Sequence, residues 1–240
     1  MRITILTLFP EMFQGPLDYS IVKRAKEKGL VKINLVNIRD FASDTYKTVD
    51  DHPYGGGTGM IMKVDVIDRA IEYAKTSYLH SVIPAQAGIH QEGTKKLDPR
   101  FRGDDTIRTI LLDPRGTPYT QTKARKLSKL DHLILVCGHY EGVDERVGSL
   151  VDERIAIGRY ILTGGELGAM IIADSVIRLI PGVLSKSDAT LNESFSETMK
   201  LEHPQYTNPR TYKRHSVPSV LISGDHKKIY RWRKDNAISA

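Results

Sequence analysis

Three short turns rich in glycine and charged residues have the composition of a ligand-binding edge. They are Leu112-Asp113-Pro114-Arg115-Gly116, Gly138-His139-Tyr140-Glu141-Gly142 and Thr163-Gly164-Gly165-Glu166, and each follows an apolar run. Glycine accepts backbone angles that other residues avoid, and it lets a ligand approach the main chain closely. In open α/β sheets, ligands bind at the edge where such strands end. Plain turns between a strand and a helix have the same composition, so the residues alone leave both interpretations open.

A fourth glycine-rich stretch, residues 48–62, contains Gly55, Gly56, Gly57 and Gly59. It is not a phosphate-binding P-loop, because no Gly-Lys-Ser/Thr sequence closes it. It is not a dinucleotide fingerprint either, because Met60 stands where the third glycine is needed. A loop that covers a substrate and a purely structural turn both fit this composition.

The C-terminal part of the sequence is strongly basic. Residues 200–234 contain nine Lys or Arg against two acids, with Tyr206, Tyr212, Tyr230 and Trp232 interleaved. Cations that contact phosphates and aromatic rings that stack on bases are typical of an RNA-binding surface. A solvated basic helix is the alternative that composition alone does not exclude.

The elements that must position these residues follow from hydrophobic patterning. Residues 2–8 and 31–37 predict strands on either side of a helix at 20–28, which Gly29 ends. Such a β-α-β beginning is typical of an α/β fold with a parallel sheet.

Further along, short apolar runs predict strands at 109–112, 133–137 and 155–161. Helices are predicted at 120–129 and 167–179, the second ending before Pro181-Gly182. The three turns described above would then lie where three strands end.

Two stretches do not fit the pattern of alternating strands and helices. A predicted helix at 63–75 is followed by residues 77–106, which prolines and glycines interrupt and which predict a surface insertion. Residues 184–208 show no periodicity and predict a linker, with a domain boundary near 185. Glu193 lies in this linker, where a single carboxylate is usually only solvated.

Composition sets the class of protein. Apolar residues make up 40% of the 240 residues and charged residues 27%, as in ordinary globular proteins. No run of 18 apolar residues predicts a membrane span, and the first residues read as a strand rather than as a signal peptide. The single cysteine, Cys137, excludes an internal disulfide, and we expect the cytoplasm as the compartment. The net charge of +6 is compatible with a polyanionic partner.

Long ordered motifs over nearly the whole chain, except residues 77–106, resemble the bacterial tRNA (guanine-N1)-methyltransferase family. They are DDHPYGGGTGMIM (50–62), LVCGHYEGVDERV (135–147), IGRYILTGGELGAM (157–170), DSVIRLIPGV (174–183), NESF (192–195), HPQYTNP (203–209) and VPSVLISGDHKKIYRWR (217–233).

The resemblance implies a SPOUT-type, trefoil-knotted α/β domain with a parallel sheet at 1–184, a linker at 185–202 and a small helical tRNA-binding domain at 203–240. It also implies a homodimer with the active site at the subunit interface. The implied reaction transfers a methyl group from S-adenosyl-L-methionine to N1 of guanosine 37 in tRNA. General rules of topology disfavour knots, so periodicity alone does not predict this one.

The resemblance also assigns the residues that contact each ligand. It implies no metal ligands. The residues matching the family's cofactor site are Leu112, Pro114, Gly116, Gly138, Glu141, Ile157, Gly158, Arg159, Tyr160, Ile161, Leu162, Gly164 and Gly165. Those assigned to the tRNA substrate are Gly55, Gly56, Gly57, Lys227 and Lys228.

Two residues are implied to act in catalysis. N1 of guanine carries a proton and is a poor nucleophile, so a base must remove the proton while charge on O6 is stabilised. Arg178 matches the family's arginine for O6. Glu193 matches the position of the general base, where the family usually has aspartate, and it offers the same carboxylate one methylene further out.

Other departures from the family's pattern concern Gly168, where the family often has proline, and Leu111, where tyrosine is common. The C-terminal domain, ending at Ala240, looks shortened. Two alternatives follow: a catalytically impaired RNA-binding protein of the same fold, and a SPOUT methyltransferase for another RNA position. Methyl transfer by the purified protein, with mapping of the modified nucleotide, separates them.

Overall fold

A computed structural model of the chain describes residues 1–82, 106–186, 190, 193–196 and 201–238. The chain divides into two compact units, Met1–Val183 and Leu184–Ala240.

The first unit is built on a five-stranded sheet whose neighbouring strands are all parallel, with the order β2-β1-β6-β5-β7. The strands are β1 (Arg2–Thr7), β2 (Lys32–Asn37), β5 (Ile107–Pro118), β6 (His132–Cys137) and β7 (Glu153–Ala156). The predicted α/β fold with a parallel sheet is confirmed.

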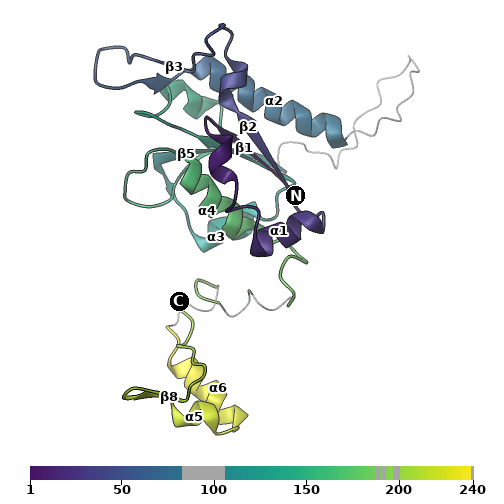
Figure 1. Ribbon diagram of the computed structural model, residues 1–240, viewed down its shortest axis with the longest axis vertical. Helices are drawn as coiled ribbons and strands as arrows, with labels where there is room; N and C mark the ends of the chain where they lie inside the picture. Colours follow the sequence, from purple (N-terminus) through teal and green to yellow (C-terminus); the bar gives the residue numbers. More distant parts are fainter. Residues whose placement is uncertain (83–105, 187–189, 191–192, 197–200, 239–240) are drawn as a thin grey trace, which may run out of the picture. The chain divides into compact units, whose positions relative to one another are not determined.

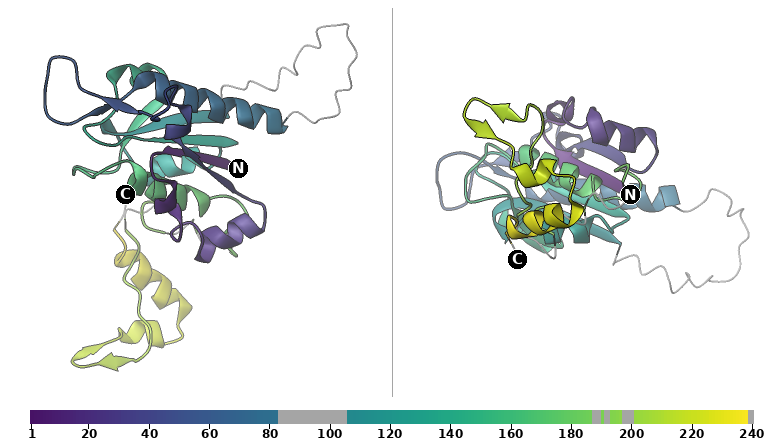
Figure 2. Two further views of the ribbon diagram at one scale, coloured as in Figure 1. Left: turned by 45° about the horizontal axis from the view of Figure 1, so that its top comes forward. Right: turned by 90° about the horizontal axis from the view of Figure 1, so that it is seen from below.

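Helices cover both faces of this sheet (Figures 1 and 2). On one face lies α2 (Val64–Val82), with the short 3-10 helices η2 (Ile38–Phe41) and η3 (Glu145–Ser149) against it. On the other face lie α1 (Ser20–Glu27), α3 (Gln121–Leu127), α4 (Glu166–Ile177) and the 3-10 helix η1 (Pro10–Phe13).

The central strand β6 shows why the sheet is enclosed on both sides. Successive side chains of a strand point to opposite faces. Leu133, Leu135 and Cys137 pack in the core beneath α4, while Ile134 and Val136 pack in the core beneath α2. All five are fully buried, so the strand is a continuous apolar run, as expected for a parallel sheet with two covered faces.

Two predicted strands have different bounds in the structure. The strand predicted at 155–161 is β7, which ends at Ala156, because its only neighbour β5 ends at Pro118, opposite Ala156. The last backbone hydrogen bond between the two chain segments runs from Tyr119 N to Ala156 O at 2.9 Å. The strand predicted at 109–112 continues to 118, because β5 pairs with β7 again at Thr117 after a register shift. Residues 113–116 are therefore an irregularity within a strand rather than a turn after one.

The helix predicted at 63–75 continues to Val82. Tertiary contacts hold this extra length: Arg2 Nη1 donates to Ser77 O at 3.2 Å, and the Tyr78 ring lies 4.6 Å from the His132 ring. Residues 77–82 are thus helical, and the remainder of the predicted insertion, apart from Thr106, lies outside the described residues. The 48–62 loop is closed at its base by a two-residue antiparallel pair, β3 (Asp50–Asp51) and β4 (Ile61–Met62).

The second unit contains the hairpin of β8 (Thr211–Tyr212) and β9 (His215–Ser216), followed by α5 (Ser219–Ile222) and α6 (His226–Asp235). Asp225 caps α6, because its side chain accepts hydrogen bonds from the backbone N–H groups of Lys227 and Lys228, both at 3.1 Å. Leu201 and Ile238 exchange two backbone hydrogen bonds of 3.2 and 3.1 Å, which tie the segment after α6 to the segment before the β8–β9 hairpin.

Across the described residues of both units, every helix is too short or too polar to cross a membrane.

Candidate active site

A cavity of about 710 Å³ opens at the ends of β6 and β7 and beside residues 112–115 at the irregular part of β5. Its walls come from four chain segments: residues 112–115, residues 138–145, residues 155–168 and Ile61 at the base of the 48–62 loop. The turns that were selected from the sequence for their glycines are therefore brought together at one site.

Backbone hydrogen bonds hold these segments against each other. Gly165 N donates to Gly138 O at 2.8 Å, and His139 forms an isolated antiparallel bridge with Gly164. On the other side of the same turn, Glu141 N donates to Met60 O at 3.1 Å. The 138–142 turn is thus fixed between the glycine pair after β7 and the loop before α2.

Glycine is required at the start of α4 because other atoms occupy the space of a side chain. A Cβ on Gly165 would lie 2.8 Å from Cys137 Cα, which is backbone and cannot move aside. A Cβ on Gly168 would lie 3.0 Å from Ile157 Cγ1 and 3.1 Å from Leu112 Cδ1. The departure at Gly168 therefore lets α4 pack closely on two residues that line the cavity.

Most residues assigned to the cofactor by resemblance line this cavity; Gly116 and Arg159 are not among its lining residues. Gly116 lies in the β5–β7 contact instead, where a Cβ would meet the Arg154 carbonyl carbon and Ile155 N, both at 2.5 Å. Arg159 is exposed. Gly55, Gly56 and Gly57 are exposed, have positive φ angles and lie outside the cavity lining, although Ile61 of the same loop reaches it.

A buried carboxylate lies beside the cavity, and the sequence predicted no role for it beyond its place in the third glycine turn. Glu166, the first residue of α4, is 2% exposed, and its Oε1 accepts a hydrogen bond of 2.8 Å from Thr7 Oγ1. Its Oε2 lies 3.9 Å from Nδ1 of the cavity residue His139. The position suits a negative charge, because the N-terminal end of a helix carries partial positive charge. The only available sequence signal was an acidic residue directly after a glycine pair at a helix start.

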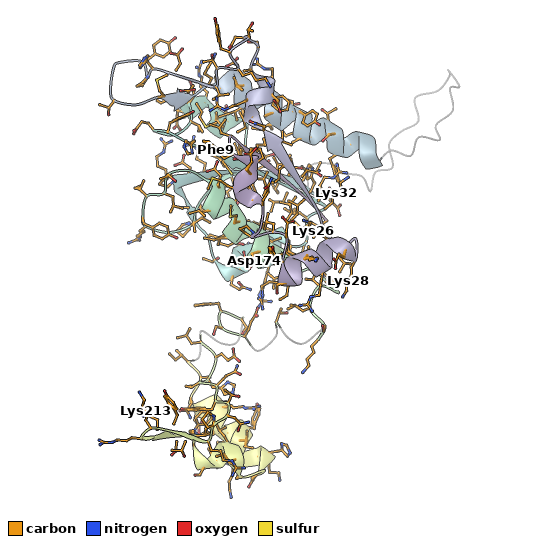
Figure 3. The ribbon with its side chains drawn as sticks, viewed as in Figure 1. Phe9, Lys26, Lys28, Lys32, Asp174 and Lys213 are labelled. Carbon is orange, nitrogen blue, oxygen red and sulfur yellow. The ribbon has the colours of Figure 1, made fainter. Side chains whose placement is uncertain are left out.

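Phe9 packs against His139, and Cys137 is buried close to Glu166. The Phe9 ring, labelled in Figure 3, lies 4.8 Å from the His139 ring. Complete burial, together with the nearby Glu166 charge, raises the pKa of the Cys137 thiol well above its ordinary value. The lone cysteine is therefore held as the neutral thiol, and it packs as a small apolar residue.

The two candidate catalytic residues belong to different units. Arg178 is half-buried in the first unit and follows the last residue of α4. Glu193 is half-exposed in the second unit, and its carbonyl accepts a 3.1 Å hydrogen bond from Ser196 N. Arg178 is not among the residues that line the cavity, which is formed at the opposite, N-terminal end of α4. Glu193 belongs to the other unit.

The candidate tRNA contacts Lys227 and Lys228 have exposed side chains in the first turn of α6. Elsewhere in the second unit, the Lys213 ammonium lies 5.4 Å from the centre of the Tyr212 ring, in the β8–β9 hairpin (Figure 3). This pairing of a cation with an aromatic ring is the combination expected of an RNA-binding surface. Within the described residues, no group of three or more His, Cys, Asp or Glu side chains is arranged to hold a metal ion.

Comparison with known proteins identifies the family. The family model described as tRNA (Guanine-1)-methyltransferase TrmD matches residues 1–240. Proteins named tRNA (guanine-N(1)-)-methyltransferase are similar over 99% of this chain. The one from Carboxydothermus hydrogenoformans is 49% identical over 239 residues, which are 83% of its length. Those from Syntrophomonas wolfei and Geobacillus kaustophilus are each 47% identical, over 86% and 87% of their lengths. The chain belongs to the tRNA (guanine-N1)-methyltransferase family.

Proposed function

We propose that this protein transfers a methyl group from S-adenosyl-L-methionine to N1 of guanosine 37 in tRNA. The observation that carries the proposal is the cavity at the ends of β6 and β7 and the irregular part of β5, in a chain of this family. Its volume of about 710 Å³ is within the usual range for small-molecule sites.

The residues present fit an adenosine-containing cofactor. Leu112, Ile155, Ile157 and Ile161 give the cavity apolar walls, while the 138–142 and 163–165 turns expose main chain. Apolar walls suit the flat faces of adenine, and backbone N–H and C=O groups can hydrogen bond to its edge. The glycines at 164 and 165 let this turn pack directly against Cys137, His139 and Glu166, which fixes its backbone at the edge of the cavity.

The reaction needs one proton acceptor and one cation from the protein. When bound, S-adenosylmethionine supplies the methyl group on a sulfonium, so no protein nucleophile is required. Transfer of the methyl group to guanine N1 would break the bond between the methyl carbon and the sulfonium sulfur and leave neutral S-adenosylhomocysteine, and the Glu193 carboxylate would accept the N1 proton. The Arg178 guanidinium stabilises the negative charge that develops on O6.

We propose that two copies of the chain form the active site together. The exposed side of α4 carries Leu167 (47% exposed) and Ile171 (44%), one helical turn apart, and Ile161 beside the cavity is 80% exposed. Apolar side chains on the outer face of a helix are typical of a protein interface. A second copy of the chain covers this face, and the linker brings Glu193 to the partner's cavity.

We propose further that the first unit is a SPOUT-type trefoil knot and the second a tRNA-binding domain. The bond from Gly165 N to Gly138 O supports the knot, because it brings the segment after β7 back across the end of β6. The basic helix α6 supports the tRNA contact, with Lys227 and Lys228 binding phosphates.

The test is methyl transfer from S-adenosylmethionine to tRNA transcripts with G or A at position 37. Transfer to the G37 transcript alone is expected for the wild type, with loss of turnover in Glu193→Gln and Arg178→Ala. The matched control is Glu202→Gln, which removes another carboxylate of the second unit and should leave turnover unchanged. Arg178→Ala should also retain cofactor affinity, since the proposal gives Arg178 a contact to guanine only.

Three results would contradict the proposal in different ways. Turnover that survives Glu193→Gln means that another group accepts the proton. Modification of a nucleotide other than G37 favours a SPOUT methyltransferase for another position. Binding of tRNA without transfer by the wild type favours the catalytically impaired RNA-binding protein.

A further inference from the structure

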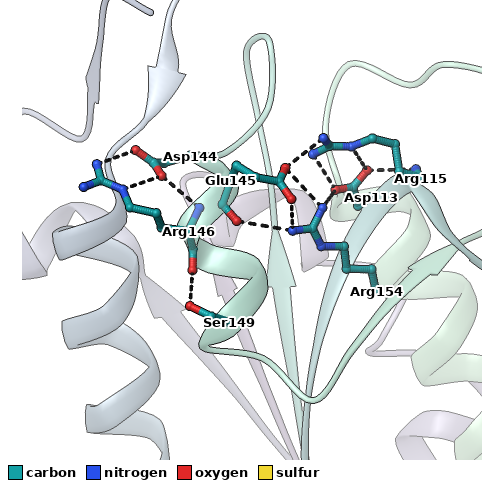
Figure 4. Close-up of polar contacts among 7 residues, drawn as sticks. All are labelled: Asp113, Arg115, Asp144, Glu145, Arg146, Ser149 and Arg154. Carbon is teal, nitrogen blue, oxygen red and sulfur yellow. Dashed lines mark hydrogen bonds and ion pairs between the residues drawn. The ribbon is translucent and has the colours of Figure 1, made fainter. Parts of the chain in front are cut away.

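Arg154 in β7 connects two segments of the cavity wall that are far apart in the sequence (Figure 4). Its Nη2 lies 2.6 Å from Glu145 Oε1 and donates to the Glu145 carbonyl at 3.2 Å. Its Nη1 lies 3.4 Å from Asp113 Oδ2. Asp113 belongs to the irregular part of β5, and Glu145 begins η3, so one guanidinium joins β5, β7 and the β6–β7 connection.

Both carboxylates bridged by Arg154 line the cavity, but Arg154 itself is not among the lining residues. It lies behind them, with its side chain 22% exposed. Arg115 makes the same bridge from the solvent side: its Nη2 lies 3.1 Å from Asp113 Oδ2, its Nη1 lies 2.8 Å from Glu145 Oε2, and its side chain is 63% exposed. Two carboxylates and two guanidiniums thus form a closed neutral cluster at the rim of the cavity.

The surrounding backbone leaves space for the Arg154 side chain. A Cβ on Gly148 in η3 would overlap the Arg154 guanidinium, and a Cβ on Gly116 would overlap the Arg154 backbone. Absence of side chains at these two positions lets Arg154 pass between η3 and β5. The position of Arg154 is therefore set by packing as well as by charge.

Both carboxylates in the cluster are ionised at neutral pH. Burial on its own raises the pKa of Asp113, but hydrogen bonds from Arg115 and the charges of Arg115 and Arg154 outweigh it, so the net pKa is lowered. The hydrogen bond from Arg154 is the main cause that lowers the pKa of Glu145. Without Arg154, two negative charges on different segments share a single exposed arginine, and their repulsion separates the segments.

We propose that Arg154 is a positioning residue of the cavity: its bridge between Asp113 and Glu145 holds the 112–115 and 138–145 walls at the spacing that the cofactor needs. The proposal rests on the proposed function, in which this cavity binds S-adenosylmethionine. Pre-forming the walls removes the cost of ordering them when the ligand enters.

The primary test is calorimetric binding of S-adenosylmethionine and S-adenosylhomocysteine to the full-length protein and its Arg154→Met variant. We expect both ligands to bind about tenfold more weakly, since small displacements of a binding wall have effects of this size or larger. S-adenosylmethionine carries one positive charge more than S-adenosylhomocysteine. Equal loss for the two ligands is the result expected of a geometric effect, and loss for only one would overturn the proposal in favour of a simple charge effect.

The chain offers a matched control in Arg146. Arg146 also pairs with a carboxylate, Asp144 at 2.7 Å, but the two lie two positions apart on the same segment and bridge nothing (Figure 4). Arg146→Met should leave both affinities unchanged. Arg154→Lys keeps the charge but lacks the planar guanidinium that reaches two carboxylates, so it should bind both ligands as weakly as Arg154→Met does. Full affinity in Arg154→Lys would show that charge alone suffices and would refute the bridge.

A second measurement does not depend on the identity of the ligand. Hydrogen exchange of the ligand-free protein should be faster in Arg154→Met at residues 112–116 and 145–149, while α2 keeps its protection. Global acceleration, or no local change, would overturn the positioning role. If the wild type binds neither ligand, the proposed cofactor is wrong, and hydrogen exchange still decides the role of Arg154.

Discussion

His132 makes the stability of the first unit depend on pH in a way that can be calculated. The residue begins β6 and is fully buried, with its Nε2 2.9 Å from Thr4 Oγ1. Its Nδ1 has no hydrogen-bond partner among the described residues. Burial, assisted by the nearby positive charge of Arg2, lowers the pKa of His132 from 6.5 to about 4. The folded protein therefore holds this imidazole neutral.

The sign of the effect follows from the lowered pKa. Above pH 6.5 His132 is neutral in both the folded and the unfolded chain and contributes nothing to the pH dependence. As the pH falls below 6.5, His132 becomes protonated in the unfolded chain, whereas in the folded chain it stays neutral until about pH 4. One pKa unit corresponds to 1.36 kcal/mol. His132 thus lowers the free energy of unfolding by about 2 kcal/mol at pH 5 and by about 3 kcal/mol below pH 4.

The assay is urea unfolding at fixed protein concentration, followed by far-ultraviolet circular dichroism at pH 7.5, 7.0, 6.5, 5.5 and 5.0. Carboxylates contribute to the pH dependence as well, so wild type is compared with His132→Gln, which cannot take up the proton. From pH 7.5 to 7 the free energies of unfolding of the two proteins should differ by a constant. Between pH 7 and pH 5 the free energy of unfolding of His132→Gln should fall by about 2 kcal/mol less than that of the wild type. Parallel curves over the whole range would refute the reasoning.

Three further predictions concern the glycine turns, the basic helix and the proposed interface. Gly165→Ala places a Cβ against Cys137 Cα, so it should lower the free energy of unfolding by about 1–3 kcal/mol and weaken cofactor binding. Urea unfolding measures the first effect and calorimetry the second, and wild-type values in both would refute the close packing. Replacing Lys227 and Lys228 by glutamine should weaken tRNA binding and reduce the slope of log affinity against log salt by about 0.9 for each lost phosphate contact, whereas an unchanged slope would exclude such contacts. Ile171→Glu introduces a charge into the exposed apolar face of α4 and should shift sedimentation from dimer to monomer, with loss of methyl transfer; a dimer that persists would place the interface elsewhere.

Much of the fold follows from local patterns in the sequence. The run Leu133–Cys137 has no polar residue to face solvent, and the structure buries it completely at the centre of the sheet. The glycine turns at its end and after β7 were selected because glycine allows close backbone approach, and they line one cavity. These features depend on neighbours in the chain, which the sequence displays directly.

Features that depend on distant residues were not predictable in the same way. β5 continues to Pro118 only because β7 pairs with it again after the register shift at Leu112. α2 extends to Val82, and contacts of Arg2 and His132 with Ser77 and Tyr78 hold its last turns.

The candidate site shows the same division between local and distant signals. Asp113 and Arg115 were visible as part of a turn, but their partners Glu145 and Arg154 were not, because no periodicity links these positions. Nothing in the pattern around Arg154 distinguishes it from a solvated strand residue. Its role emerges only when β5, η3 and β7 are assembled.

The strand order has a consequence for synthesis of the chain on the ribosome. β1 lies between β2, which follows it closely, and β6, whose His132 is 128 residues beyond Thr4. At translation rates of about 5–20 residues per second, β1 waits several seconds with one edge unpaired after β2 has been made. During this interval Ile3 and Ile5, both fully buried in the finished protein, belong to an open strand edge of the kind that promotes aggregation. Protection of this nascent edge, by the ribosome surface or by a chaperone, is therefore a requirement that the topology imposes on the cell that makes the protein.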